Sequence, residues 1–135
     1  MAAGRRIYEG THVDVSFDAA RCRHAAQCAR GLSAVFDTSR RPWIAPDGAD
    51  PAAVVEVVAR CPTGALRAHP HEVAPEPAVS PATLQALPGG PLLIRGDLDV
   101  GGERETRAAL CSCGATANQP YCDGSGSCSG WPASR

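Results

Sequence analysis

The sequence predicts an α+β protein made of two small modules that a proline-rich linker joins. An alternating strand pattern at residues 13–17 precedes one clear helix that begins near Pro51, as in a small mixed fold. Prolines then recur at short intervals, which favours an extended connector. Two further strand patterns, with glycines between them, follow this connector. We place the first module at residues 8–68, the linker at residues 69–89 and the second module at residues 90–135.

The composition indicates that apolar burial alone does not stabilise these modules. Only 23 of the 135 residues are Val, Leu, Ile or Phe, and this share is below the roughly 20% that is usual for a well-cored domain. The formal net charge of −1 argues against disorder, because disordered chains combine low hydrophobicity with high net charge. Small modules of this kind are commonly stabilised by a bound metal. We therefore expect cofactors.

The seven cysteines are expected to be metal ligands in a reducing, cytoplasmic compartment. The N-terminus lacks an apolar signal-peptide region, and an odd cysteine count does not suit a disulfide framework. No apolar run reaches the roughly 18 residues that a membrane helix needs. All 13 basic residues are arginines, and 14 acidic residues balance them. We therefore expect binding neither to a membrane nor to a nucleic acid.

The first module is expected to hold its helix between a strand and a short closing strand. Residues 13–17 alternate between apolar and polar side chains, as in a half-buried strand. Asp50 is the expected N-cap of the helix and Pro51 its first residue. Val54, Val55 and Val58 should form its apolar face. Pro62 prevents continuation, which puts Cys61 at the helix C-terminus.

Three cysteines of this module follow a ferredoxin-like spacing. The motifs are Val-x-Val-x-Phe-Asp, Cys22-x-His24-x3-Cys28, Arg-Pro-Trp-Ile and Cys61-Pro-Thr-Gly-Ala-Leu. The segment resembles the divergent mono-cluster ferredoxin family of small (4Fe–4S)-binding bacterial proteins. The bacterial run is C-x2-C-x2-C with a remote Cys-Pro, and Ala25 occupies the position of its middle cysteine.

The resemblance implies that Cys22, Cys28 and Cys61 bind a [3Fe–4S] cluster, or a [4Fe–4S] cluster whose fourth iron has another ligand. His24 is the candidate for that ligand, one position from the missing cysteine. The alternatives are that the three cysteines are small buried apolar residues and that His24 only packs or forms hydrogen bonds.

The linker and the strands of the second module lead to another group of cysteines. Within the linker, only a turn of helix at residues 82–86 is expected to interrupt the extended chain. Residues 92–100 read as a strand with a bulge or bend at Gly96. A second strand at residues 106–110 then leads directly to Cys111.

Three thiols gather on one irregular loop after this strand. Cys111 and Cys113 are one residue apart, so on an extended segment they point to the same face. Gly114 allows the backbone to turn, and a further turn is expected directly after Cys122, at Asp123-Gly. Such a set of thiols indicates a soft metal centre.

The stretch from Cys111 to Ser125 resembles the CDGSH iron–sulfur family, whose pattern is C-x-C-x2-[S/T]-x3-P-x-C-D-G-[S/T/A]-H. That family binds one [2Fe–2S] cluster through three Cys and one His, and the histidine falls on Gly126 here. Cys128 lies two residues further on, and we expect it to replace the histidine. The alternative is that Cys128 is a free thiol and that water or a partner completes the site.

The function expected from these patterns is that of a redox protein with a [2Fe–2S] cluster and a [3Fe–4S] or [4Fe–4S] cluster. It would serve in one-electron transfer, or in cluster storage or transfer. The sequence offers no nucleophile–base pair, paired-carboxylate cleft or phosphate-binding loop, so we do not expect an enzyme. The expected cofactor-binding and metal-ligating residues are Cys22, Cys28, Cys61, Cys111, Cys113, Cys122 and Cys128.

The expected partner is a redox protein that the sequence does not name, and the CDGSH resemblance raises the expectation of a homodimer. Because the linker shares no ligands with either module, each module should hold its cluster independently. The alternative from another class is a non-redox, zinc-binding interaction module, since four cysteines in a glycine-rich loop also suit tetrahedral zinc.

Overall fold

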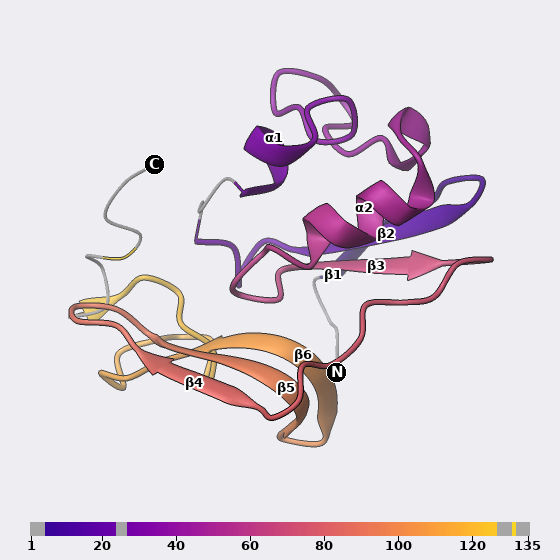
Figure 1. The fold of residues 1–135 in the computed structure, drawn as a ribbon. Helices are drawn as coiled ribbons and strands as arrows, with labels where there is room; N and C mark the ends of the chain where they lie inside the picture. Colours follow the sequence, from indigo (N-terminus) through magenta and orange to yellow (C-terminus); the bar gives the residue numbers. More distant parts are fainter. Residues whose placement is uncertain (1–4, 24–26, 127–130, 132–135) are drawn as a thin grey trace.

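The computed structural model describes residues 5–23, 27–126 and 131, and every statement about structure below refers to these residues. It consists mostly of small β-sheets with few helices, arranged as two modules (Figure 1). No helix in the described part of the chain is long and apolar enough to cross a membrane.

The N-terminal module is built on an antiparallel sheet with the strand order β1-β2-β3. Its strands are β1 (Arg5–Tyr8), β2 (Val13–Asp18) and β3 (Leu66–Pro70). The central strand β2 pairs Val15 with Tyr8 on one side and with Ala68 on the other. The strand predicted at residues 13–17 is confirmed, with Val13 and Val15 buried. The predicted alternation does not continue, because Ser16 is buried and Phe17 is only partly buried.

Helices lie on one side of this sheet (Figure 1). They are α1 (Gln27–Gly31), the short 3-10 helix η1 (Pro46–Gly48) and α2 (Pro51–Val58). Helix α2 begins at Pro51 as predicted, but the Asp50 carboxylate makes no capping hydrogen bond. Its buried face contains Val57 in place of the predicted Val55, together with Val54 and Val58. The apolar core of the module joins this face to β2, Val35, Phe36 and Ile44.

The C-terminal module is a second antiparallel sheet with the order β4-β5-β6. It contains β4 (Thr83–Ala86), β5 (Leu92–Val100) and β6 (Glu103–Leu110). The ladder between β5 and β6 shifts register between Arg95 and Leu98, which confirms the predicted irregularity at Gly96. This sheet lies beside the first sheet, on the side away from the helices (Figure 1).

The predicted turn of helix at residues 82–86 is wrong, because residues 83–86 form strand β4. Pro81 and Pro88 leave too few residues between them for a stable helix. The backbone groups of the segment instead pair with the edge of β5, from Leu92 to Arg95. Part of the segment predicted as a linker therefore belongs to the second sheet.

Candidate metal centres

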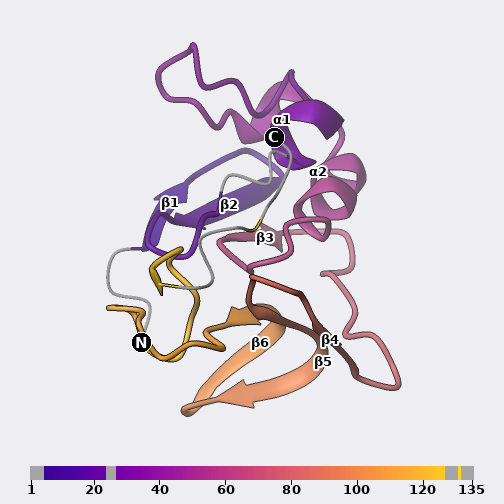
Figure 2. The ribbon, with the colours of Figure 1, turned by 90° about the vertical axis from the view of Figure 1, so that its left-hand side faces the viewer.

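The end of β6 positions the C-terminal cysteines. The Cys111 N–H donates to the Pro120 carbonyl at 2.8 Å, and the Cys122 N–H donates to the Ala109 carbonyl at 2.8 Å. The loop thus returns alongside the strand from which it starts, on the side of the second sheet that faces β1 and β2 (Figure 2). This return packs Cys122 with Ala109 in a small buried cluster, and Cys113 packs against that cluster.

Two sulfur atoms of this loop lie close together, and one of them accepts a backbone hydrogen bond. Cys111 Sγ and Cys113 Sγ are 3.8 Å apart. The Gly114 N–H donates to Cys111 Sγ at 3.2 Å, and such donors stabilise a thiolate. Cys122 is only 1% exposed. The arrangement suits a thiolate-bound centre from which water is largely excluded.

Gly126, which occupies the position of the family histidine, lies beside Cys113. A Cβ added there would be 3.1 Å from Cys113 Sγ and 2.7 Å from Ala115 Cβ. The backbone at Gly126 has a φ of +60°, which disfavours other residues. A side chain at position 126 would therefore lie against Cys113 Sγ. Cys128, the predicted fourth ligand, lies outside the described residues.

Asp123 fixes the shape of the loop. Its carboxylate accepts hydrogen bonds from the Ser125 and Ala117 backbone N–H groups, each at 3.0 Å. Hydrogen bonds from the Ser125 side chain and from these N–H groups lower the pKa of Asp123 to about 2. Thr116 adds a hydrogen bond from its hydroxyl to the Tyr121 carbonyl at 2.7 Å. Both residues belong to the family pattern, yet their role as loop organisers was not predicted from the sequence.

The three N-terminal cysteines come from three different elements. Cys22 lies beyond the end of β2, Cys28 lies in α1, and Cys61 follows α2. Burial, together with the nearby Cys61 and Cys22 sulfurs, raises the pKa of Cys28 to about 11. Thiols that oppose each other's ionisation in this way are suited to a metal, which displaces their protons on binding. His24 and Ala25 lie outside the described residues.

Cys61 differs from Cys28, because its surroundings favour the thiolate. Burial by itself would raise the pKa of Cys61, but hydrogen bonds from Thr63 and from the Leu66 backbone, together with the Arg107 charge, lower it. The Thr63 hydroxyl lies 3.5 Å from Cys61 Sγ. Arg107 comes from the other module, and no sequence pattern pointed to it.

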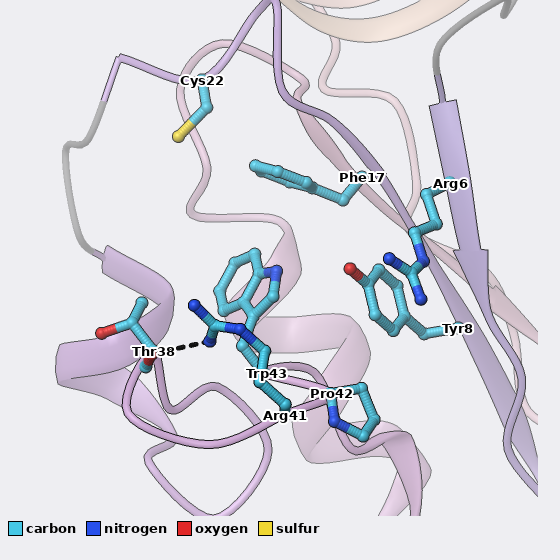
Figure 3. Close-up of a pocket in the computed structure, with 8 residues that line it drawn as sticks. All are labelled: Arg6, Tyr8, Phe17, Cys22, Thr38, Arg41, Pro42 and Trp43. Carbon is cyan, nitrogen blue, oxygen red and sulfur yellow. Dashed lines mark hydrogen bonds between the residues drawn. The ribbon is translucent and has the colours of Figure 1, made fainter.

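A cavity of about 700 Å³ opens beside Cys22. Phe17 and Trp43 contribute aromatic rings to its lining, and Arg6 and Arg41 contribute positive charge (Figure 3). The Phe17 and Trp43 rings meet edge to face with centroids 5.1 Å apart. Cys22, one of the three N-terminal cysteines, is therefore accessible from this cavity.

The described residues do not form a complete metal site by themselves. Within residues 5–23, 27–126 and 131, no three Cys, His, Asp or Glu groups converge closely enough to hold a single metal ion. Cys111 and Cys113 nevertheless lie side by side, and Cys28 lies near Cys61 and Cys22. Their thiol chemistry suits iron–sulfur ligation.

Comparison with known proteins bears out both sequence resemblances, in the predicted order. Residues 8–71 match the family model described as divergent 4Fe-4S mono-cluster. Residues 89–125 match the model described as iron-binding zinc finger, CDGSH type. These two families indicate a 4Fe–4S mono-cluster and a [2Fe–2S] cluster as cofactors.

Similar proteins are also found among curated bacterial sequences. The uncharacterized protein YjdI from Escherichia coli strain K12 is 47% identical over 67 residues, which cover 50% of this chain and 88% of YjdI. YjdI from E. coli O157:H7 gives the same values. No solved structure matches the chain significantly.

Proposed function

We propose that this chain is an electron-transfer protein with two different clusters. The chain belongs to the divergent 4Fe-4S mono-cluster family, and a CDGSH-type iron-binding domain follows its mono-cluster domain. The family matches make it an iron–sulfur protein. The observation that supports the finer proposal is the separation of six cysteines into two groups, three in the N-terminal module and three in the C-terminal module. Iron–sulfur clusters supply one-electron redox chemistry when bound.

We assign the [2Fe–2S] cluster to Cys111, Cys113 and Cys122, with Cys128 as the fourth ligand. The second cluster is assigned to Cys22, Cys28 and Cys61. Because Ala25 replaces a cysteine, that cluster is either a [3Fe–4S] cluster or a [4Fe–4S] cluster with one non-cysteine ligand.

The residues around the ligands support retention of the clusters rather than their delivery to other proteins. Cys122 is almost fully buried, and a hydrogen bond ties its backbone to the strand end at Ala109. Thr63 and Arg107 stabilise the Cys61 thiolate. Electrons would enter or leave at Cys22, where the cavity lined by Arg6 and Arg41 accepts an anionic group of a redox partner.

Protein purified without air should be brown and should contain iron and acid-labile sulfide, with little zinc. The visible spectrum and the analysis of iron, sulfide and zinc measure this directly. Colourless protein with stoichiometric zinc would instead support the zinc-binding interaction module. Rapid movement of the clusters to an apo-acceptor would support cluster transfer over electron transfer.

A further inference from the structure

The two modules are joined by charged side chains that are buried between them. Arg21 of the N-terminal module and Glu105 of β6 form two hydrogen bonds of 3.1 and 3.2 Å, and both residues are at most 5% exposed. Arg67 of β3 also contacts Glu105. Buried ion pairs need well-defined geometry, so the interface holds the modules in a fixed arrangement.

One of these crossing side chains reaches a predicted cluster ligand. Arg23, which directly follows Cys22, is 7% exposed and donates through Nη1 to Cys122 Sγ of the other module. Its Nη2 donates to the Trp131 carbonyl, and its guanidinium lies 5.5 Å from the centre of the Trp131 ring.

The C-terminal loop has space for this guanidinium because residue 124 is glycine. A Cβ added at Gly124 would lie 3.1 Å from Arg23 Nε and 3.2 Å from Arg23 Cζ. Four separate features therefore converge on one buried arginine: a sulfur, a carbonyl, an aromatic face and a missing side chain. Arg23 is seated in the cysteine loop and does not merely pass over it.

A reciprocal contact runs in the opposite direction. Arg107 of β6 is buried and donates to the carbonyls of Cys61 at 2.6 Å and Leu66 at 3.0 Å. Glu76 holds it through two hydrogen bonds of 2.8 Å. Each module therefore places an arginine in the ligand-bearing loop of the other.

A guanidinium beside a ligand sulfur has a predictable electrostatic effect. Charge-assisted hydrogen bonds are about twice as strong as neutral ones, and they strengthen as the acceptor becomes more negative. A cluster gains one negative charge when it is reduced. A buried arginine at its ligand therefore stabilises the reduced form more than the oxidised form, which raises the reduction potential.

We propose that Arg23 is a positioning residue that the N-terminal module contributes to the C-terminal cluster, where it orients Cys122 and raises the reduction potential. The inference rests on the proposed two-cluster function. Because Cys22 and Arg23 are adjacent, the site that fixes Cys22 also fixes Arg23. The potential of the C-terminal cluster thus depends on the N-terminal cluster site, even though the two clusters share no ligand.

The test is the reduction potential of the [2Fe–2S] cluster in the full-length protein with Arg23→Leu. We expect the equilibrium constant for its reduction to fall by about tenfold, which is about 59 mV for one electron. Arg23→Lys, which keeps the charge, should recover part of the loss. Arg95→Leu is the matched control, because Arg95 also crosses the interface but donates to the Ala59 carbonyl at 2.8 Å; its effect should be below twofold.

A second variant shows whether the effect depends on the N-terminal site. Cys28→Ser should preserve the [2Fe–2S] spectrum but shift its potential in the same direction as Arg23→Leu, and the double variant should show little further shift. If Arg23→Leu does not retain the cluster, Arg23→Gln, which keeps a donor without the charge, is measured and should show the same direction of shift.

An unchanged [2Fe–2S] potential in Arg23→Leu, or in Arg23→Gln where that variant is needed, would overturn the inference and leave the two-cluster function intact. An additive shift in the double variant would overturn the dependence on the N-terminal site. Wild-type protein without a [2Fe–2S] signal would instead contradict the proposed function itself.

Discussion

Glu105→Gln is expected to destabilise the full-length protein by about 3–5 kcal/mol, because it leaves the buried Arg21 guanidinium without its negative partner. Glu105 also contacts Arg67 and accepts a hydrogen bond from the Tyr121 hydroxyl at 3.1 Å. Urea unfolding of the cluster-loaded protein should show a lower midpoint. A midpoint equal to that of the wild type would mean that this ion pair does not hold the modules together.

The pH dependence of stability gives a second readout for this variant. Burial would raise the pKa of Glu105, but the hydrogen bonds and charges of Arg21 and Arg67 lower it below its ordinary value of 4.5. The stabilisation is therefore present above about pH 4.5 and is lost as the pH falls through the lowered pKa. Glu105→Gln should remove this loss on acidification.

Glu56→Gln is the matched control for a charge change of the same kind. Glu56 pairs with Arg60 on the surface of α2 at 3.1 Å, and both side chains are at least half exposed. Exposed pairs of this type contribute about 0.3–0.5 kcal/mol. The urea midpoint of this variant should therefore stay close to that of the wild type.

Cys122→Ser is expected to abolish the [2Fe–2S] signal and leave that of the N-terminal cluster. A serine hydroxyl is a poor ligand for iron in such a cluster, and the site is almost fully buried. Visible and electron paramagnetic resonance spectra measure both clusters in one sample. Ser112→Ala is the control within the same loop, because Ser112 is not a predicted ligand. Its hydroxyl instead donates to the Gly90 carbonyl at 2.9 Å. A full [2Fe–2S] signal in Cys122→Ser would remove Cys122 from the ligand set.

Local sequence patterns predicted the elements that depend on neighbouring residues. The strand at residues 13–17, the Pro51 helix start and the irregularity at Gly96 are all present in the structure. The buried face of α2 was predicted less well, because Val55 and Val57 have the same hydrophobicity and packing against β2 and β3 decides between them.

Strand β4 could not be predicted from local patterns. Its four residues are all exposed and carry little periodic information. They become a strand because the edge of β5 offers backbone partners from Leu92 to Arg95. Such pairing is a property of the tertiary fold, and short segments commonly follow it against their own propensity.

The buried interface was missed for a related reason. No local pattern links Arg21 to Glu105, because the two residues are 84 positions apart in the chain. Glu105, Arg107 and Ala109 share one face of β6, and all three are buried in the structure. The alternation in the sequence places the two charged residues on one face, but only the structure shows that this face is buried.

A reductive titration of the wild-type protein, followed by electron paramagnetic resonance, tests the two-cluster account most directly. Two separate one-electron transitions are expected, one from a [2Fe–2S] cluster and one from a [3Fe–4S] or [4Fe–4S] cluster. Cys122→Ser should remove only the first transition and Cys28→Ser only the second. A single transition in fully iron-loaded protein, or the loss of both transitions in either variant, would contradict it.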